Sequence, residues 1–133
     1  MTQTLIVLAH PKPSSFNHAW ADATAKALIA NGHQVVTSDL YAMGFNPVLA
    51  DPDTPVTDDV ASEIARIRQA DRIVFHFPLW WFAPPAILKG WFDRVLAHPE
   101  LHSSKRRFDT GICKGKKALF CVTTGCTEAE SAH

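Results

Sequence analysis

The sequence predicts an α/β fold in which helices cover both faces of a parallel sheet. Short runs of branched apolar residues alternate along the chain with longer segments in which apolar residues recur at helical spacing. Most of the short runs are continuous, which is typical of strands buried on both faces of a sheet. Regular alternation of such strands with helices indicates parallel pairing and right-handed crossovers, as in doubly wound sheets.

Four strands and three helices are expected in alternating order. Ser14, Ser15 and Asn17 offer N-cap side chains for the first helix, and Gly32 stands where a helix commonly ends. The expected elements are strands at 4–9, 34–38, 73–77 and 118–123, and helices at about 16–31, from 58 onward and from 84 onward.

Length and composition fit one globular domain spanning residues 1–133. With 47% hydrophobic and 20% charged residues, a chain of 133 residues can bury a core without disulfides or metal. The formal net charge is zero, so the sequence lacks the basic footprint of a nucleic-acid-binding protein. No apolar stretch is long enough to span a bilayer, and we expect no membrane insertion.

Cysteine and histidine spacing predicts no metal site. The three cysteines form no Cys-x-x-Cys pair, and an odd number of thiols favours a reducing compartment, hence the cytoplasm. Of the seven histidines, only His98 and His102 stand close together, and Pro99 between them argues against a helical pair of ligands.

Three segments that can carry chemistry follow the first, third and fourth strands. In open parallel sheets, ligands bind beyond the carboxyl ends of the strands, where the strand order reverses. The first segment, His10–Asn17, places hydroxyl and amide groups before a helix N-terminus, which attracts phosphate. It matches neither the P-loop nor the dinucleotide-binding fingerprint, and helix capping alone explains the same residues.

The second and third segments favour a planar ligand at the same edge. Phe75–Phe82 gathers aromatic residues around a strand end, although such residues also serve simply as core. Trp80, Trp81 and Phe82 are consecutive, so we expect one or two of them to face a cleft or a partner. Thr123–Gly125 lets a ligand approach the backbone closely, although a plain strand-ending turn uses the same residues. Together the segments favour a phosphorylated planar cofactor without identifying it.

A long and distinctive motif spans Phe77–Val95 and reads Phe-Pro-Leu-Trp-Trp-Phe-Ala-Pro-Pro-Ala-Ile-Leu-Lys-Gly-Trp-Phe-Asp-Arg-Val. This motif resembles that of the DT-diaphorase-type NAD(P)H:quinone oxidoreductases. The resemblance covers essentially the whole chain, with shorter matching segments at Leu5–His10, Ser15–Asn17, Ser38–Met43 and Phe45–Pro47.

The resemblance implies a flavodoxin-like fold, a bound FAD with FMN as the alternative, and a homodimer with sites at the subunit interface. It implies two-electron hydride transfer from NAD(P)H through the flavin to a small-molecule quinone. Trp81, Phe82 and Gly125 are the expected catalytic positions. The implied cofactor-binding residues are His10, Ser15, Phe16, Asn17, Pro78, Leu79, Trp80, Trp81, Phe82, Thr123, Thr124 and Gly125.

Two departures from the family pattern bear on activity. Cys126 stands where the family usually has a second glycine, so its side chain narrows the approach to the flavin or marks a separate branch. Family members also continue with a fifth strand, a last helix, and a Tyr and a His that assist the reduced flavin. None of these has a counterpart here, and His133 lies too early in the pattern for that role. We therefore expect the sheet to end in an exposed edge strand.

Two other interpretations stay open at the level of sequence. In the first, the chain is a flavin-binding regulatory subunit of a partner such as a potassium-efflux system. In the second, it is an inactive truncated fragment.

Overall fold

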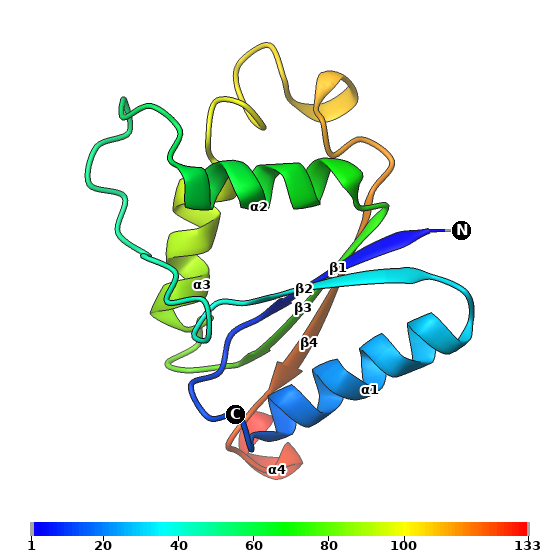
Figure 1. Cartoon of the computed structure of the whole chain (residues 1–133). Helices are drawn as coiled ribbons and strands as arrows, with labels where there is room; N and C mark the ends of the chain where they lie inside the picture. Colours follow the sequence, from blue (N-terminus) through cyan, green and yellow to red (C-terminus); the bar gives the residue numbers. More distant parts are fainter. Residues whose placement is uncertain (1, 133) are drawn as a thin grey trace.

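A computed structural model describes residues 2–132 and confirms the expected order of strands and helices (Figure 1). Each strand lies within one residue of its expected bounds. A single turn near the C-terminus, α4, was not expected, and the third helix continues beyond α3 as a π-helical turn at Phe92–Leu96. The elements are β1 (Gln3–Leu8), α1 (Phe16–Ala30), β2 (Gln34–Asp39), α2 (Asp58–Gln69), β3 (Arg72–Pro78), α3 (Ala86–Trp91), β4 (Lys117–Thr123) and α4 (Glu128–Ser131).

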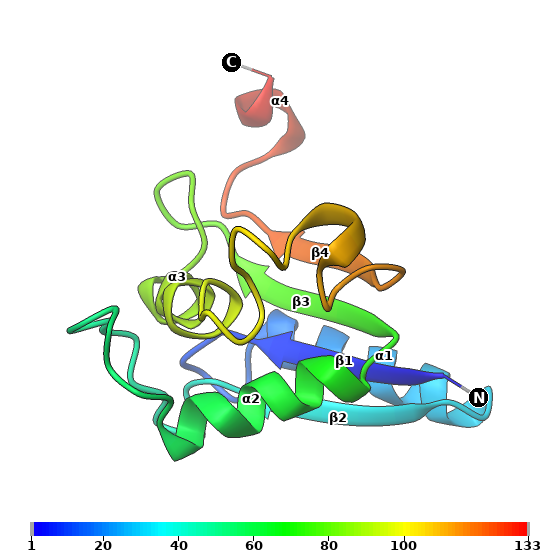
Figure 2. The same cartoon turned by 90° about the horizontal axis from the view of Figure 1, so that it is seen from above.

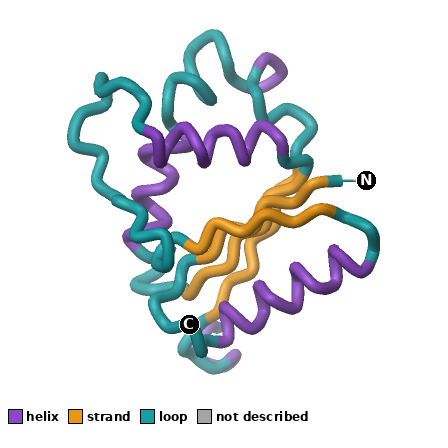
Figure 3. Tube along the Cα trace, in the orientation of Figure 1, coloured by secondary structure: helices purple, strands orange, loops and turns teal. Residues whose placement is uncertain are grey.

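The four strands form one parallel sheet in the order β2-β1-β3-β4 (Figure 2). Helix α1 covers one face of the sheet, while α2 and α3 cover the other (Figures 1 and 3). This arrangement confirms the doubly wound prediction and is a flavodoxin-like fold with four strands. Because the chain passes from β2 across β1 to reach β3, the strand order reverses between β1 and β3, which is where such folds bind ligands.

The two faces of the sheet are packed to different extents. On the α2 and α3 side, strand residues such as Leu5 and Phe75 pack with Ile64, Ile67 and Trp91 into the larger apolar cluster. The α1 side holds a smaller apolar cluster of Ile6, Leu8, Ala21, Val74 and Cys121. Within residues 2–132, no helix is both long and apolar enough to cross a bilayer.

Ser15 and Gly32 delimit α1 as the sequence predicted. The Ser15 backbone is extended, with φ −70° and ψ 157°, and its hydroxyl oxygen accepts from the His18 N–H at 3.2 Å. Gly32, with φ +83°, reverses the chain just after the C-cap, a conformation that costs glycine little.

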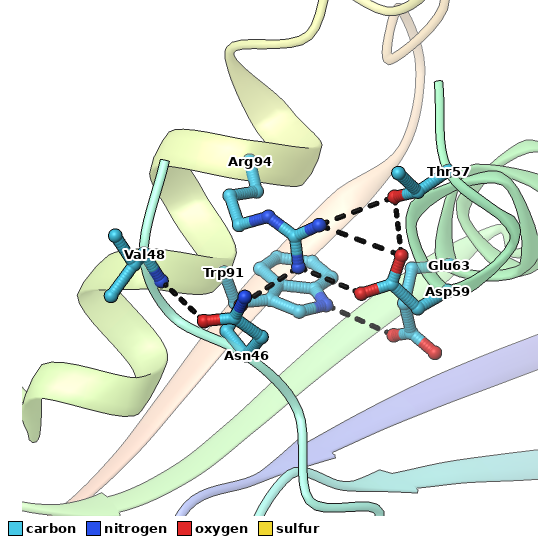
Figure 4. Close-up of polar contacts among 7 residues, drawn as sticks. All are labelled: Asn46, Val48, Thr57, Asp59, Glu63, Trp91 and Arg94. Carbon is cyan, nitrogen blue, oxygen red and sulfur yellow. Dashed lines mark hydrogen bonds and ion pairs between the residues drawn. The ribbon is translucent and has the colours of Figure 1, made fainter. Parts of the chain in front are cut away.

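A buried carboxylate joins α2 to the last residue of α3. Glu63 is fully buried, and its Oε2 accepts from the Trp91 indole N–H at 2.9 Å (Figure 4). Its Oε1 accepts from Arg66 at 3.0 Å, and the same guanidinium nitrogen donates to the Ser38 hydroxyl at 2.7 Å. Burial of a charge is tolerated only where both oxygens are paired in this way, so the network fixes α2 against β2 and α3.

Arg94 holds the long segment between β2 and α2 against the helices (Figure 4). Its Nη1 donates to the Asn46 carbonyl and to Asp59 Oδ2, both at 2.7 Å, and its Nη2 donates to the Thr57 hydroxyl at 3.2 Å. Only 11% of the Arg94 side chain is exposed, so its planar guanidinium is largely shielded from water. The Arg94 hydrogen bond lowers the pKa of Asp59 from 3.8 to about 2.

This ion pair predicts a specific loss of stability in acid. Because the pKa of Asp59 is lower in the folded state, its contribution is complete above pH 3.8 and disappears as the pH falls toward 2. Asp59 is 40% exposed, so solvent screening limits the contribution to about 1 kcal/mol. Urea unfolding should therefore show Asp59→Asn less stable than the parent at pH 7, with the gap closing near pH 2. Asp53→Asn, in the same acidic segment, is the control, and an equal gap at both pH values would contradict the assignment.

At Gly90, α3 lies very close to the segment between β2 and α2. A Cβ at this position would lie 2.2 Å from the Pro47 carbonyl oxygen and 2.4 Å from its Cα, so backbone would have to move. Mid-helix Gly→Ala normally stabilises by about 0.5–1 kcal/mol. Here the clash with Pro47 outweighs that gain, and we expect Gly90→Ala to destabilise the fold by about 1–3 kcal/mol. Thermal unfolding checks this, with the exposed Lys89→Ala as a control; a raised Tm for Gly90→Ala would refute the close approach.

Candidate functional site

The three segments that sequence reasoning selected meet at the carboxyl edge of the sheet. The N–H of Leu79, just after β3, donates to the Thr123 carbonyl at 2.8 Å. Asn17, in the first turn of α1, donates from Nδ2 to the Thr123 hydroxyl at 2.9 Å. The His10 ring, just after β1, lies edge-on to Trp80 with ring centroids 6.0 Å apart. Contacts therefore connect all three segments, from residues far apart in the sequence.

A strained turn presents two of the aromatic residues to solvent. Trp80 and Ala83 exchange backbone hydrogen bonds of 2.9 and 3.1 Å, closing a tight turn around Trp81 and Phe82. Both central residues are left-handed, with φ 49° and 61°, a region that turns usually fill with Gly or Asn. Their side chains are 93% and 91% exposed. Bulky residues in this conformation cost of order 1–3 kcal/mol each, which points to a role at a functional surface.

The turn forms one wall of a hollow of about 320 Å³. The opposite wall is Thr124, Gly125 and Cys126, which follow β4. A Cβ built on Gly125 would meet nothing within 4 Å, so the space beside its backbone is open. The Cys126 Sγ lies 3.0 Å from the Ser131 hydroxyl of α4. Hydrogen bonds from Ser131 and from Thr124 lower the pKa of the Cys126 thiol. The hollow thus combines exposed aromatic rings with an open strand end.

The Ser15 hydroxyl is already engaged at the start of α1. It lies 2.8 Å from His18 Nδ1, while His18 Nε2 lies 3.2 Å from the Asp39 carboxylate. A carboxylate can only accept, so His18 Nε2 donates to Asp39. Ser15 therefore serves as helix cap and as hydrogen-bond partner of the His18 ring. The expectation that it also holds a cofactor phosphate stays a prediction.

Asn17 and Thr123 tie α1 to the end of β4. Asn17 is only 3% exposed, and its Oδ1 has no hydrogen-bond partner among the described residues. Because the Thr123 oxygen accepts from Asn17, the Thr123 hydroxyl proton remains able to donate. Both residues thus sit where the sequence placed them, with a contact to each other that it did not reveal.

The remaining expected site residues lie around the hollow rather than in it. Pro78 ends β3 opposite Thr123, and Trp80 is half-exposed beside His10. Phe16 is 68% exposed and contacts Trp20, with ring centroids 5.8 Å apart, so it extends the aromatic surface along α1. His10 Nδ1 accepts from the Lys12 N–H at 3.0 Å, which fixes the loop before α1.

Sequence reasoning missed a buried histidine under α1. His76 of β3 is fully buried against Trp20, with ring centroids 5.3 Å apart. The Thr24 hydroxyl donates to the Trp20 carbonyl, so its oxygen accepts from His76 Nε2 at 3.2 Å. Nδ1 has no hydrogen-bond partner within residues 2–132. Burial lowers the pKa of His76, which keeps it neutral. A single histidine within the apolar run 73–77 was the available signal.

Comparison with known proteins gives a consistent assignment. The sequence model of a family described as "Flavodoxin-like fold" matches residues 2–133. NAD(P)H dehydrogenase [quinone] 1 of Rattus norvegicus is 39% identical over 146 residues, covering 92% of this chain and 53% of the relative. The chain thus spans about half the length of this relative.

Solved structures agree with the sequence matches. An NAD(P)H:quinone oxidoreductase from Methanothermobacter marburgensis superposes with a TM-score of 0.83 at 31% identity, covering 98% of this chain and 69% of the other. General stress protein 14 from Treponema denticola, solved in complex with FMN, gives a TM-score of 0.66 at 29% identity, covering 96% of this chain and 64% of the other. The chain belongs to the flavodoxin-like family that includes the NAD(P)H:quinone oxidoreductases.

Proposed function

We propose that the chain is the flavin-binding part of an oxidoreductase that uses NAD(P)H to reduce quinones. The observation that carries the proposal is the 320 Å³ hollow in which the exposed Trp81 and Phe82 lie beside Thr124 and Gly125. The similar proteins from Rattus norvegicus and Methanothermobacter marburgensis are named as enzymes of NAD(P)H and quinone, which supports these as the two substrates.

The residues around the hollow fit a flavin ring. Trp81 and Phe82 offer aromatic faces on which a planar ring can stack, because neither side chain is covered by protein. The open space beside Gly125 admits a flat ring against the backbone. The free Thr123 proton supplies a donor for a ring carbonyl. When bound, a flavin provides the hydride-accepting centre, while the chain binds and orients it.

The phosphate-bearing part of the cofactor is assigned to the loop before α1. The N-terminus of this 15-residue helix favours anions, and His10 and Phe16 flank it. We assign FAD as the cofactor on the family resemblance, with FMN as the alternative that titration separates. We also place the protein in the cytoplasm, since its three cysteines are free thiols, two of them exposed, as suits a reducing compartment. We assign a homodimer on the family resemblance alone.

The visible spectrum of the purified protein tests the proposal directly. After incubation with FAD or FMN and removal of free flavin, we expect retained flavin absorbance that bleaches when NADH or NADPH is added without oxygen. Reoxidation by a quinone should then restore the bands. Retained bands that never bleach would contradict the oxidoreductase assignment and favour a regulatory flavin-binding subunit. Protein that retains neither flavin would refute the site.

Replacement of Trp81 by glycine separates cofactor binding from stability. Trp81→Gly removes the stacking surface, and we expect about a tenfold loss of flavin affinity. Glycine adopts the left-handed backbone conformation of residue 81 without strain, so the Tm should rise or stay the same. Flavin fluorescence titration and thermal unfolding measure the two effects.

Phe108→Gly is a matched control for this variant. Phe108 is also left-handed, with φ 51°, and is 85% exposed, but it does not line the hollow. It should gain stability without any change in flavin affinity. Equal flavin affinities for Trp81→Gly and the parent would remove Trp81 from the site.

A further inference from the structure

Helix α1 is held to the sheet by less apolar packing than the helices on the other face. Asn17 and Ala21 are the buried residues of α1, whereas α2 buries Val60, Ile64 and Ile67 together with Glu63. The apolar cluster beneath α1 is also the smaller of the two. Elements with few buried apolar contacts open at a lower free energy than the rest of a fold. We therefore expect α1 to separate from the sheet more readily than α2.

A titratable ring lies in the contact between α1 and the sheet. His76 of β3 is fully buried, and its cross-strand neighbours are Leu8 of β1 and Cys121 of β4. The ring meets the Trp20 indole edge-on, with ring centroids 5.3 Å apart. His76 Nε2 donates to the Thr24 hydroxyl oxygen at 3.2 Å. Two residues of α1 thus rest directly on this histidine.

The hydrogen bonds of this contact suit only a neutral imidazole. The Thr24 hydroxyl donates to the Trp20 carbonyl at 2.9 Å, so its oxygen is the acceptor for His76 and the ring proton lies on Nε2. Nδ1 then carries a lone pair, which has no partner in the described part of the chain. A proton added to Nδ1 would create both a buried charge and a donor without an acceptor, and both are costly.

The groups that face the ring do not compensate such a charge. Trp20 and Thr24 of α1 and Leu8 of β1 carry no charge. Cys121 of β4 is the titratable neighbour, and burial raises the pKa of its thiol, which keeps it neutral. Burial also lowers the pKa of His76 from its ordinary value of 6.5. Protonation of the ring is therefore opposed as long as α1 covers it.

The charged residues of α1 do not favour its release in acid. Lys26 and Asp22 pair with each other at 2.7 Å on the exposed side of the helix. His18 Nε2 lies 3.2 Å from the Asp39 carboxylate of β2, an attraction that a charged imidazole retains. Carboxylates titrate mainly below about pH 5. A response of α1 between about pH 7.5 and about pH 5.5 therefore belongs to His76.

We propose that the contact of His76 with Thr24 and Trp20 is a pH-sensitive switch, and that protonation of His76 releases α1 from the sheet. Water can reach Nδ1 only when α1 moves away, so the open form takes up the proton more readily than the closed form. Because the pKa of His76 is lower in the closed form, the contact is fully stable above pH 6.5 and weakens as the pH falls below that value. The charge change is local, and α1 is the element that responds to it.

Release of α1 would also change the candidate site. Asn17 in the first turn of α1 donates to the Thr123 hydroxyl at 2.9 Å, and this bond is lost when the helix moves. The N-terminus of α1 is also the assigned position of the cofactor phosphate. Acid should therefore weaken cofactor binding. This consequence rests on the proposed function, whereas the release of α1 does not.

Hydrogen exchange of backbone amides tests the switch without any ligand. Between about pH 7.5 and about pH 5.5, we expect the protection factors of α1 to fall by up to about tenfold, because the open form binds one more proton. Those of α2, on the other face of the sheet, should stay the same. A loss of protection that is equal in α1 and α2, or no loss in α1, would overturn the proposal.

His76→Gln identifies the titrating group. The glutamine amide can still donate to Thr24 but does not titrate, so α1 should stay protected at both pH values. His102→Gln, which removes an exposed histidine, is the matched control and should behave like the parent. A His76→Gln variant that loses protection in acid as the parent does would refute the role of His76.

The ring nitrogens provide a second test that needs no variant. Two-dimensional ¹H–¹⁵N spectra of the imidazoles should show His76 as the neutral Nε2–H tautomer at about pH 7.5. While α1 stays protected, this signal should not titrate with a midpoint at the ordinary value of 6.5. The opposite tautomer, or a ring protonated at both nitrogens beneath a protected α1, would contradict the switch.

Flavin titration at the same two pH values separates this inference from the proposed function. Affinity should fall in acid for the parent but not for His76→Gln, and the comparison cancels any titration of the flavin itself. A chain that binds neither FAD nor FMN at either pH would refute the proposed function and leave the exchange test of the switch intact. Equal pH dependence of flavin affinity in the two proteins would overturn the consequence for the site.

Discussion

The last pair of the β3–β4 ladder, Pro78 opposite Thr123, is the constraint on which the candidate site depends. The even-numbered residues of β3 bond toward β1, as the Ala9 N–H to His76 carbonyl bond shows, so the missing N–H of Pro78 ends the pairing with β1 and not with β4. The next residue, Leu79, still donates to the Thr123 carbonyl, which holds the departing loop beside the end of β4. Asn17 then binds the Thr123 hydroxyl and adds the start of α1 to the same point. One threonine thus sets the spacing of three loops.

The strain in the aromatic turn is held by that frame. Two backbone hydrogen bonds between Trp80 and Ala83 close the turn, and the Leu79 bond anchors its base. Glycine at Trp81 or Phe82 would adopt the same backbone at lower cost, so stability alone does not account for aromatic residues there. Their near-complete exposure has the same implication, since stacking a ligand on either ring would remove apolar surface from water and so favour binding. The two aromatic residues therefore lower the stability of the free chain and provide a surface on which a ligand can stack.

Much of the fold could be predicted from sequence because most of its strands are continuous apolar runs, with a proline or glycine near one end. The site could be predicted only as three strand ends, since a parallel sheet gathers its carboxyl ends at one edge. The contacts within it could not be predicted, because Asn17 and Thr123 are 106 residues apart in the chain. The burial of Glu63 could have been predicted, because it lies on the same helical stripe as the apolar residues of α2, Val60, Ile64 and Ile67. A buried charge there needs a polar partner. Its partner Trp91 lies 28 residues away, beyond the reach of periodicity.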